Sequence, residues 1–219
     1  MAYAIICAGG KGLRFGGDRP KQFIEIDGDP ILHKTVSVFE KTNGIEKIVV
    51  VCPEDFISDA EEILSDCKKA YATKGGSDRN LSVMNGIAFI EGNFSLDEGT
   101  IIVTHDAVRP FVTEKMITDS IAAAEKYGAS VAAVPCVDTI IEVENGNVTA
   151  VPDRSRMYNV QTPQTFFAKK LRDLYLSLSD EEKEVLTDCS RIYVSKGETV
   201  KIIEGDVKNI KITYKSDIE

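Results

Sequence analysis

Short apolar runs rich in β-branched residues alternate with helix-like patterns along the first two-thirds of the chain. These runs are apolar along nearly their whole length, which is typical of strands that are covered on both faces. They predict strands at residues 3–8, 47–52, 70–74, 101–104 and 129–134.

Between these runs, apolar residues recur at three- and four-residue steps, as on the buried face of a helix. The spacing predicts helices within residues 56–67, 81–90 and 116–124. Thr113 is the expected N-cap of the third helix, and Gly128 is its expected C′ residue.

This alternation predicts an α/β fold, with a Rossmann-like, mostly parallel mixed sheet that has helices on both faces. Ligands of such sheets bind beyond the carboxyl ends of the strands. We therefore expect the chemistry in the segments that follow Ala8, Lys74 and Thr104.

After residue 135 the pattern changes. Two short segments flank Asn145-Gly146, which is a strong signal for a type I′ β-hairpin. A two-stranded hairpin is marginally stable alone, so we expect it to pack against the parent domain or against a second subunit. The sequence thus predicts one domain over residues 1–219, with a protruding β-arm at about residues 137–157.

Two further signals lie near the end of the chain. Ser179, followed three residues later by Glu182, predicts the capping box of a short helix. Residues 200–204 and 209–214 have the pattern of late strands.

Charge and composition narrow the function. With 26 Lys and Arg against 35 Asp and Glu, the 219-residue chain has a net charge of −9, which argues against a nucleic-acid coat protein. The five scattered cysteines are expected to be reduced and buried, and two histidines argue against a His-rich zinc site. No apolar run reaches membrane length, so we expect a cytoplasmic protein.

The segment after the first predicted strand concentrates glycines and cations: residues 8–22 hold five glycines and four Lys or Arg. Glycines let the backbone direct N–H groups at a phosphate chain, and the cations neutralise its charge. The segment lacks the G-K-[ST] of a P-loop, and Phe15 stands where a dinucleotide fingerprint needs its third glycine. A bound triphosphate explains this pattern better than a flexible surface loop does.

The chain also carries a set of motifs in the order in which one enzyme family has them. They are A-G-G-x-G-x-R followed by P-K-Q within residues 8–22, and the segments at residues 75–86, 104–110, 161–164, 187–188 and 209–213. With these motifs the chain resembles the cytidylyltransferase branch of the nucleotidyltransferases that join a sugar or sugar-alcohol phosphate to a nucleoside triphosphate. The resemblance covers essentially the whole chain and implies a GT-A-like version of the fold.

The resemblance implies transfer of the cytidylyl group of CTP to a sugar-alcohol phosphate, with release of pyrophosphate and no covalent intermediate. Residues 103–112, 157–158 and 178–188 resemble the members that make CDP-ribitol from D-ribitol 5-phosphate for teichoic-acid and cell-wall synthesis. The loop from Arg14 to Lys21 instead has the length typical of members that use 2-C-methyl-D-erythritol 4-phosphate in isoprenoid synthesis. The resemblance therefore favours D-ribitol 5-phosphate as the acceptor, with 2-C-methyl-D-erythritol 4-phosphate as the alternative.

The same resemblance implies two CTP-binding segments. It also implies that two cations, Arg14 and Lys21, stabilise the transition state. The alternative for both cations is a solvated position on the surface. The implied CTP-binding residues are Cys7, Ala8, Gly9, Gly10 and Gly12 at the triphosphate, Gly76, Ser77, Asp78, Arg79 and Ser82 at the base and ribose, and Asp106 and Ala107. The alternative for the second segment is a turn and a helix N-cap, with Ser77 as the cap.

The implied acceptor-binding residues are Asp106, Arg109, Thr139, Arg154, Thr162, Thr187 and Lys211. Arg154 and Lys211 are expected to be catalytic by holding the acceptor phosphate. Asp106 is the expected ligand of Mg²⁺, with capping of the following turn as its structural alternative, whereas His105 is expected to pack or to make a structural hydrogen bond. Members of the family assemble as homodimers through the β-arm, which implies the same assembly here.

Two hypotheses of other classes stay open. A non-catalytic CTP-binding module would usually have lost Arg14, Lys21 or Lys211, and all three are present. A structural protein without a nucleotide site would leave the loop of glycines and cations unexplained.

Overall fold

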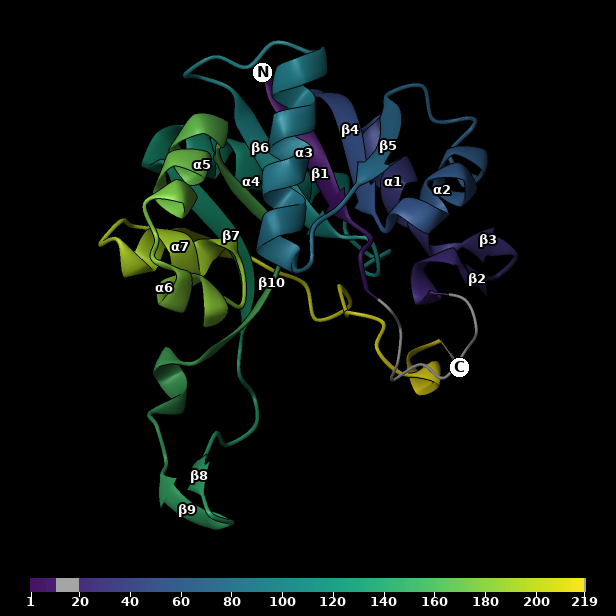
Figure 1. Ribbon diagram of the computed structural model, residues 1–219. Coiled ribbons are helices and arrows are strands. Elements are labelled where there is room, and N and C mark those ends of the chain that lie inside the picture. Colours follow the sequence, from purple (N-terminus) through teal and green to yellow (C-terminus); the bar gives the residue numbers. More distant parts are fainter. Residues whose placement is uncertain (11–19, 219) are drawn as a thin grey trace.

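Within the residues that the computed structural model describes, 1–10 and 20–218, seven strands form one sheet in the order β11-β7-β10-β6-β1-β4-β5 (Figure 1). The strand β1 (Ala2–Cys7) pairs in parallel with β4 (Ile45–Cys52) on one side and with β6 (Ile101–Asp106) on the other. The remaining strands of the sheet are β5 (Ala70–Lys74), β7 (Ala129–Pro135), β10 (Tyr158–Phe167) and β11 (Lys201–Glu204). Two of the predicted site residues, Gly12 and Arg14, lie outside the described part of the chain.

The strand β10 makes the sheet mixed, because it is antiparallel to both of its neighbours, β6 and β7. The hydrophobic pattern does not predict this strand, since its buried positions include Gln161, Thr162 and Gln164. Its pairing with β7 shifts register between Val160 and Gln164. This irregular stretch brings polar side chains to the carboxyl end of β6.

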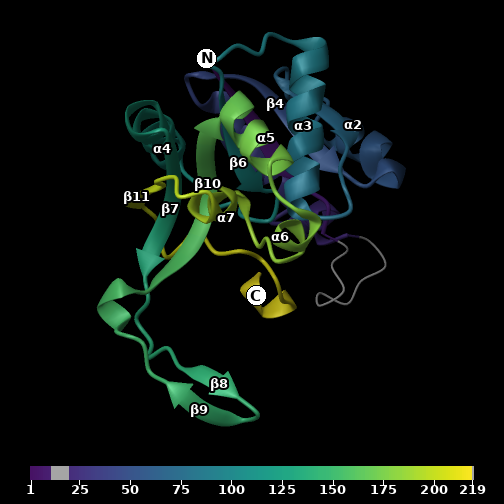
Figure 2. The ribbon, with the colours of Figure 1, turned by 60° about the vertical axis from the view of Figure 1, so that its left-hand side comes forward.

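Helices cover both faces of the sheet, as predicted (Figure 2). On one face the apolar sides of α1 (Ile31–Lys41), α2 (Ile57–Ile63) and α4 (Glu114–Tyr127) pack against the strands. On the other face lie α3 (Arg79–Asn93), α5 (Ala168–Leu176) and α7 (Cys189–Ser195). Each face is centred on a fully buried ring, Phe39 and Phe166 respectively, and truncating such a ring typically costs about 3–5 kcal/mol.

The predicted helix ends are confirmed. The Thr113 hydroxyl accepts from the N–H of Met116 at 3.2 Å, and Gly128 follows α4 with φ of 94°, a conformation that glycine adopts without strain. Ser179 and Glu182 form the capping box of α6 (Asp180–Glu184).

The predicted hairpin is also confirmed. It consists of β8 (Glu142–Glu144) and β9 (Asn147–Ala150), and the positive φ values of Asn145 (50°) and Gly146 (80°) are those of a type I′ turn. The hairpin projects away from the sheet, at the end of the two segments that join it to β7 and β10 (Figures 1 and 2). The short helix η3 (Arg154–Arg156) lies on the returning segment.

The strand predicted at residues 209–214 is wrong, whereas the one at 200–204 corresponds to β11. Residues 209–214 instead run as irregular chain past the carboxyl end of β6 (Figure 1). Ile212 donates its N–H to the carbonyl of Val108 at 2.9 Å, and its own carbonyl accepts from the Lys21 ammonium at 2.6 Å. These backbone groups therefore bond to loop and side-chain partners rather than to a neighbouring strand.

The five cysteines are free, as expected, and Cys52, Cys67 and Cys189 are buried. Cys7 and Cys136 are only partly buried, so the expectation of burial is wrong for these two. Among the described residues, no helix has both the length and the apolar character to cross a bilayer.

Candidate functional site

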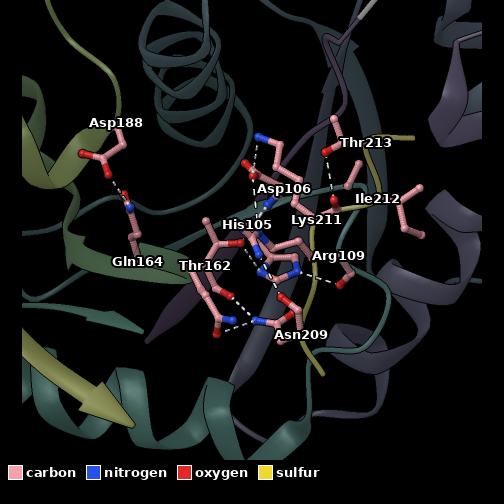
Figure 3. A network of polar contacts seen from close by, with 12 residues as sticks. His105, Asp106, Arg109, Thr162, Gln164, Asp188, Asn209, Lys211, Ile212 and Thr213 are labelled. Atoms are coloured by element: carbon pink, nitrogen blue, oxygen red, sulfur yellow. Dashed lines mark hydrogen bonds and ion pairs between the residues drawn. The ribbon is translucent and has the colours of Figure 1, made fainter. Parts of the chain in front are cut away.

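Asp106, the last residue of β6, lies at the centre of a cluster of cations (Figure 3). Its Oδ1 accepts from Nε of Arg79 at 3.0 Å, and its Oδ2 lies 2.9 Å from Nζ of Lys211 and 3.6 Å from Nε of Arg109. Arg79 begins α3, Arg109 follows β6, and Lys211 comes from the irregular segment near the end of the chain. Three distant parts of the sequence thus meet at one carboxylate.

The charge balance of this cluster favours an anion. Three cations against one carboxylate leave a net charge of +2. Burial alone would raise the pKa of Asp106, but the charges of Arg79, Lys211 and Arg109 hold it well below its usual range. Asp106 is therefore ionised at neutral pH, and the excess positive charge is available to a ligand.

A chain of hydrogen bonds orients Asp106 from behind. Its backbone N–H donates to the Thr162 hydroxyl at 3.2 Å, and that hydroxyl donates to Nδ1 of His105 at 2.8 Å. Nε2–H of His105 in turn donates to the carbonyl of Arg109 at 3.1 Å. Burial lowers the pKa of His105 to about 4, which keeps the ring neutral and allows both of its hydrogen bonds. His105 thus has the structural role expected of it.

Asn209 fixes two of the predicted acceptor residues. Its carbonyl accepts from Nη1 of Arg109 at 2.8 Å, and its Nδ2 donates to the carbonyl of Thr162 at 2.8 Å. The sequence places Asn209 in a motif but assigns it no role. Asn209 is fully buried, which the sequence does not indicate for a polar residue in a predicted strand. It therefore supports the site residues by its hydrogen bonds.

The end of β1 supplies a glycine corner beside this cluster. Cys7 accepts from the N–H of Ala107 at 3.0 Å, while Ala8 donates to Val51 at 2.8 Å and accepts from the Gln22 amide. These bonds anchor the strand end, whereas Gly9 and Gly10 are exposed. Of the predicted triphosphate residues that the structure describes, the two glycines therefore present the accessible backbone.

The turn before α3 lies against that corner. A Cβ placed on Gly9 would come within 3.9 Å of Oγ of Ser82, so the two predicted CTP segments are neighbours. The Ser82 hydroxyl accepts from the N–H of Gly76 at 2.9 Å and donates to the carbonyl of Asp78 at 2.7 Å, which holds the turn.

The cap of α3 differs from the expected one. Asp78, not Ser77, caps the helix, because its carboxylate accepts from the N–H of Leu81 at 2.9 Å. Asp and Ser are equally good caps, so composition alone could not choose between these neighbours. Ser77 is exposed and donates to the Asp78 carboxylate at 3.1 Å.

Lys21 is not a solvated surface cation. Its side chain is buried, and its bond to the carbonyl of Ile212 joins the first loop to the segment that carries Lys211. Arg14, its predicted companion, lies outside the described residues.

Within the described part of the chain, three predicted acceptor residues form no hydrogen bond or ion pair with the Asp106 cluster. Thr139 and Arg154 are exposed on the β-arm, where Nη1 of Arg154 donates to the carbonyl of Val137 at 2.8 Å. Thr187 is exposed just before α7, two residues from Cys189, whose Sγ lies 3.8 Å from Nη1 of Arg79.

Several buried polar atoms of the site have no hydrogen-bond partner among the described residues. They are Nη2 of Arg79, Nε of Arg109, Oδ1 of Asn209 and Oε1 of Gln164. A buried donor or acceptor left unpaired costs about 1–3 kcal/mol, so such atoms at a strand end are typical of a site that completes its bonds with a ligand.

A divalent cation fits this cluster together with a polyphosphate rather than alone. Asp106 offers an ionised oxygen ligand, which suits Mg²⁺, but the net charge of the cluster repels a bare dication. The triphosphate that accompanies Mg²⁺ would reverse that balance.

The chain matches, over residues 2–219, the family model described as IspD: 2-C-methyl-D-erythritol 4-phosphate cytidylyltransferase. It is 45% and 46% identical to two proteins named ribitol-5-phosphate cytidylyltransferase, from Streptococcus pneumoniae strains Spain 23F-1 and D39, over 100% of this chain and 96% of theirs.

Two solved structures are similar over 99% of this chain. One is 4-diphosphocytidyl-2C-methyl-D-erythritol synthase from Anaerococcus prevotii, with a TM-score of 0.83, 30% identity and 92% of that chain covered. The other is 2-C-methyl-D-erythritol 4-phosphate cytidylyltransferase from Francisella tularensis, with a TM-score of 0.85, 27% identity and 96% covered. The whole-length match, in sequence and in sheet architecture, means that this chain belongs to the IspD family of cytidylyltransferases.

Proposed function

We propose that this protein transfers the cytidylyl group of CTP to D-ribitol 5-phosphate, giving CDP-ribitol and pyrophosphate. The observation that carries the proposal is the Asp106 cluster, an anion-binding centre built at the strand ends of a chain with whole-length identity to ribitol-5-phosphate cytidylyltransferases.

Transfer of the cytidylyl group depends more on neutralising negative charge than on moving a proton. The second pKa of a phosphate monoester is about 6, so at neutral pH the acceptor is already a nucleophile. One of its oxygens attacks the α-phosphorus of CTP in line. A new P–O bond forms as the bond to the β,γ-diphosphate breaks, and pyrophosphate leaves with that electron pair. The main barrier is the meeting of two polyanions, which pre-positioned cations lower.

CTP would lie between the glycine corner at Gly9-Gly10 and the turn before α3. Backbone N–H groups of the corner would bind the triphosphate, with Gly12, Arg14 and Lys21 beside them. Gly76, Ser77 and Asp78 would face the base and ribose.

The acceptor phosphate would bind on the far side of Asp106. Lys211 is half-exposed there, and Arg109 has a buried Nε without a hydrogen-bond partner among the described residues. Thr162 and Thr187 would contact the polyol. Each such cation, if lost, typically costs about 3–4 kcal/mol of transition-state stabilisation.

Arg154 and Thr139 would complete this acceptor site from a second subunit. Both are exposed on the β-arm, which carries an unusual set of exposed apolar side chains: Val137, Ile141, Val143, Val148 and Val151. Exposed apolar surface on a marginal hairpin indicates an interface. We therefore propose a homodimer in which each arm reaches the other subunit's cation cluster.

Mg²⁺ is the proposed cofactor. When bound with CTP it would neutralise triphosphate charge and polarise the α-phosphate, and Asp106 is the residue that would hold it. Apart from Mg²⁺, the Lys and Arg side chains of the site would hold the CTP triphosphate and the acceptor phosphate in place.

The test is an acceptor panel. The full-length protein is incubated with CTP, Mg²⁺ and either D-ribitol 5-phosphate, 2-C-methyl-D-erythritol 4-phosphate or another polyol phosphate, and pyrophosphate release is measured. Preference for ribitol 5-phosphate is expected. Preference for methylerythritol phosphate would replace the proposed acceptor, and CTP binding without turnover on any acceptor would favour the non-catalytic module.

A further inference from the structure

A second cluster of chemically reactive side chains lies on the α1–α2 side of the sheet, on elements that supply none of the four charged side chains of the Asp106 cluster. It contains His33 in the first turn of α1, and Asp66 and Cys67 in the turn after α2. Their ligand atoms, one nitrogen, one carboxylate oxygen and one sulfur, all lie within 4.8 Å of one another. We propose that these three side chains bind a zinc ion.

The distances from the Asp66 oxygen to the other two ligand atoms are close to those of tetrahedral coordination. Oδ1 of Asp66 lies 3.2 Å from Nε2 of His33 and 3.6 Å from Sγ of Cys67. Zinc bond lengths of about 2.0–2.3 Å at tetrahedral angles separate an oxygen ligand from a nitrogen by about 3.4 Å and from a sulfur by about 3.6 Å. The Asp66 oxygen thus already lies close to both of these distances.

Asp29 orients the histidine for this task. Its Oδ1 lies 2.6 Å from Nδ1 of His33, a contact that favours the proton on that nitrogen. Nε2 then has its lone pair free for a cation, 3.2 Å from Oδ1 of Asp66 and 3.4 Å from Oγ of Ser37. A carboxylate behind a metal-binding imidazole is the usual means of fixing its tautomer and orientation. Without a cation between them, a neutral Nε2 and the Asp66 carboxylate would present two acceptors to each other.

The donor set selects the metal. One thiolate, one imidazole and one carboxylate suit Zn²⁺, whereas Mg²⁺ and Ca²⁺ prefer oxygen ligands alone. Burial and the charge of Asp66 raise the pKa of the Cys67 thiol to about 12, so metal binding must release its proton to solvent. Water would supply the fourth ligand. The ion would fasten the start of α1 to the turn that leads into β5.

The experiment uses the full-length reduced protein without CTP. Zn²⁺ is titrated against a chromophoric chelator, and Co²⁺ serves as a spectroscopic probe, because thiolate coordination gives a charge-transfer band. The variants are Cys67→Ser and His33→Gln, with Asp29→Asn for the orienting contact. The control is Cys136→Ser, which removes a free cysteine outside the cluster.

We expect one Zn²⁺ per chain and a cobalt–thiolate band that Cys136→Ser retains and Cys67→Ser abolishes. Because even outer contacts of a metal site are worth about 10–100-fold in affinity, Asp29→Asn should weaken zinc binding about tenfold, and the loss of a direct ligand should weaken it at least about 100-fold. Zinc at a hundredfold above its Kd should raise the Tm by about 5–10 °C.

A folded wild-type protein that gives no band would overturn the proposal. A band or zinc affinity unchanged in both Cys67→Ser and His33→Gln would overturn it as well. If Cys67→Ser does not fold, His33→Gln decides, because that side chain is 23% exposed and its replacement leaves the core intact.

Discussion

Nζ of Lys211 lies 2.9 Å from Oδ2 of Asp106, although the two residues come from an irregular late segment and from the end of a central strand. Lys211 is 46% exposed and Asp106 is 9% exposed, so the lysine forms the open side of the pair. Arg79 and Arg109 still pair with the buried Asp106 carboxylate when Lys211 is replaced, so the half-exposed lysine contributes little to folding. Its position suits the binding of an incoming phosphate.

Lys211→Met is therefore expected to reduce kcat/KM about 100- to 1,000-fold while leaving the Tm nearly unchanged. The matched control is Lys208→Met, an exposed lysine three residues earlier in the same segment. Steady-state pyrophosphate release and thermal melts measure the two effects. Retained turnover in Lys211→Met would remove Lys211 from the acceptor site.

A shared active site predicts complementation between two inactive variants. Arg154→Ala lacks a competent arm, and Lys211→Met lacks a competent cluster. In a mixed dimer, one of the two sites would join the intact arm of one variant to the intact cluster of the other. Random exchange should then restore about a quarter of the wild-type activity, because half of the dimers are mixed and half of their sites are intact.

Activity is measured after the two variants are mixed, unfolded and refolded together. Each variant refolded alone is the control. Mixtures no more active than their components would contradict the exchange of arms, even if the proposed reaction is correct.

The lowered pKa of His105 predicts that part of the folding stability is lost at acid pH. Its pKa in the folded protein is about 4, below the 6.5 of an unperturbed histidine. The folded state thus binds fewer protons than the unfolded state between these values. Stability from the neutral ring is complete above pH 6.5 and declines as the pH falls toward 4, by up to about 3 kcal/mol.

Urea unfolding at a series of pH values measures this component. Carboxylates such as Asp106 also lose their charge at the acid end, so the comparison is with His105→Gln, which keeps hydrogen-bonding groups but does not titrate. The variant should be less stable at pH 7 and lose less stability between pH 6.5 and 4. Parallel curves would mean that His105 does not titrate as described.

Two glycines of the proposed CTP site should respond differently to alanine. A Cβ on Gly76 would lie 2.5 Å from Cγ of Leu81, whereas a Cβ on Gly10 would meet nothing within 4 Å. Gly76→Ala should therefore destabilise the fold by about 1–3 kcal/mol. Gly10→Ala should leave the Tm unchanged and weaken CTP binding, because the methyl group occupies accessible backbone at the glycine corner.

Thermal melts with and without CTP separate these effects. A wild-type CTP-induced rise in Tm that Gly10→Ala retains in full would argue against a triphosphate at the end of β1.

Lys21→Ala tests the first loop. Because its ammonium group is buried and holds the carbonyl of Ile212, we expect a loss of both turnover and stability, with the stability loss near 1–3 kcal/mol for an unpaired buried acceptor. Chemical denaturation and pyrophosphate release measure both. A stability unchanged by the substitution would mean that this contact does not hold the late segment.

Local pattern determined much of this protein. The apolar runs identified β1, β4, β6 and β7, because strands covered on both faces must be apolar throughout. They also identified β5, the partly exposed strand at the edge of the sheet. Asn145-Gly146 determined the hairpin, since few other residue pairs adopt two positive φ values. The position of Asp106 at a strand end likewise followed from the sequence.

Tertiary structure decided what local pattern cannot encode. The buried stretch of β10 from Gln161 to Thr165 carries mostly polar side chains. Its Thr162 and Gln164 bond to residues from other parts of the chain, so no periodic hydrophobic signal marks it as a strand. Residues 209–214 alternate like a strand, yet they cross the strand ends because their backbone groups bond to Lys21 and Val108.

The Asp106 cluster and the zinc-binding cluster proposed at His33, Asp66 and Cys67 also depend partly on sequence and partly on tertiary structure. Residue types and motifs identified the cations around Asp106, but which of them touch it, and that Arg154 does not, depended on the path of the arm. His33 and Cys67 carry no spacing signal, because the fold alone brings the start of α1 to the turn after α2. Contacts between distant segments arise from the packing of whole helices and strands. Local sequence patterns predict the individual helices and strands but not how these pack.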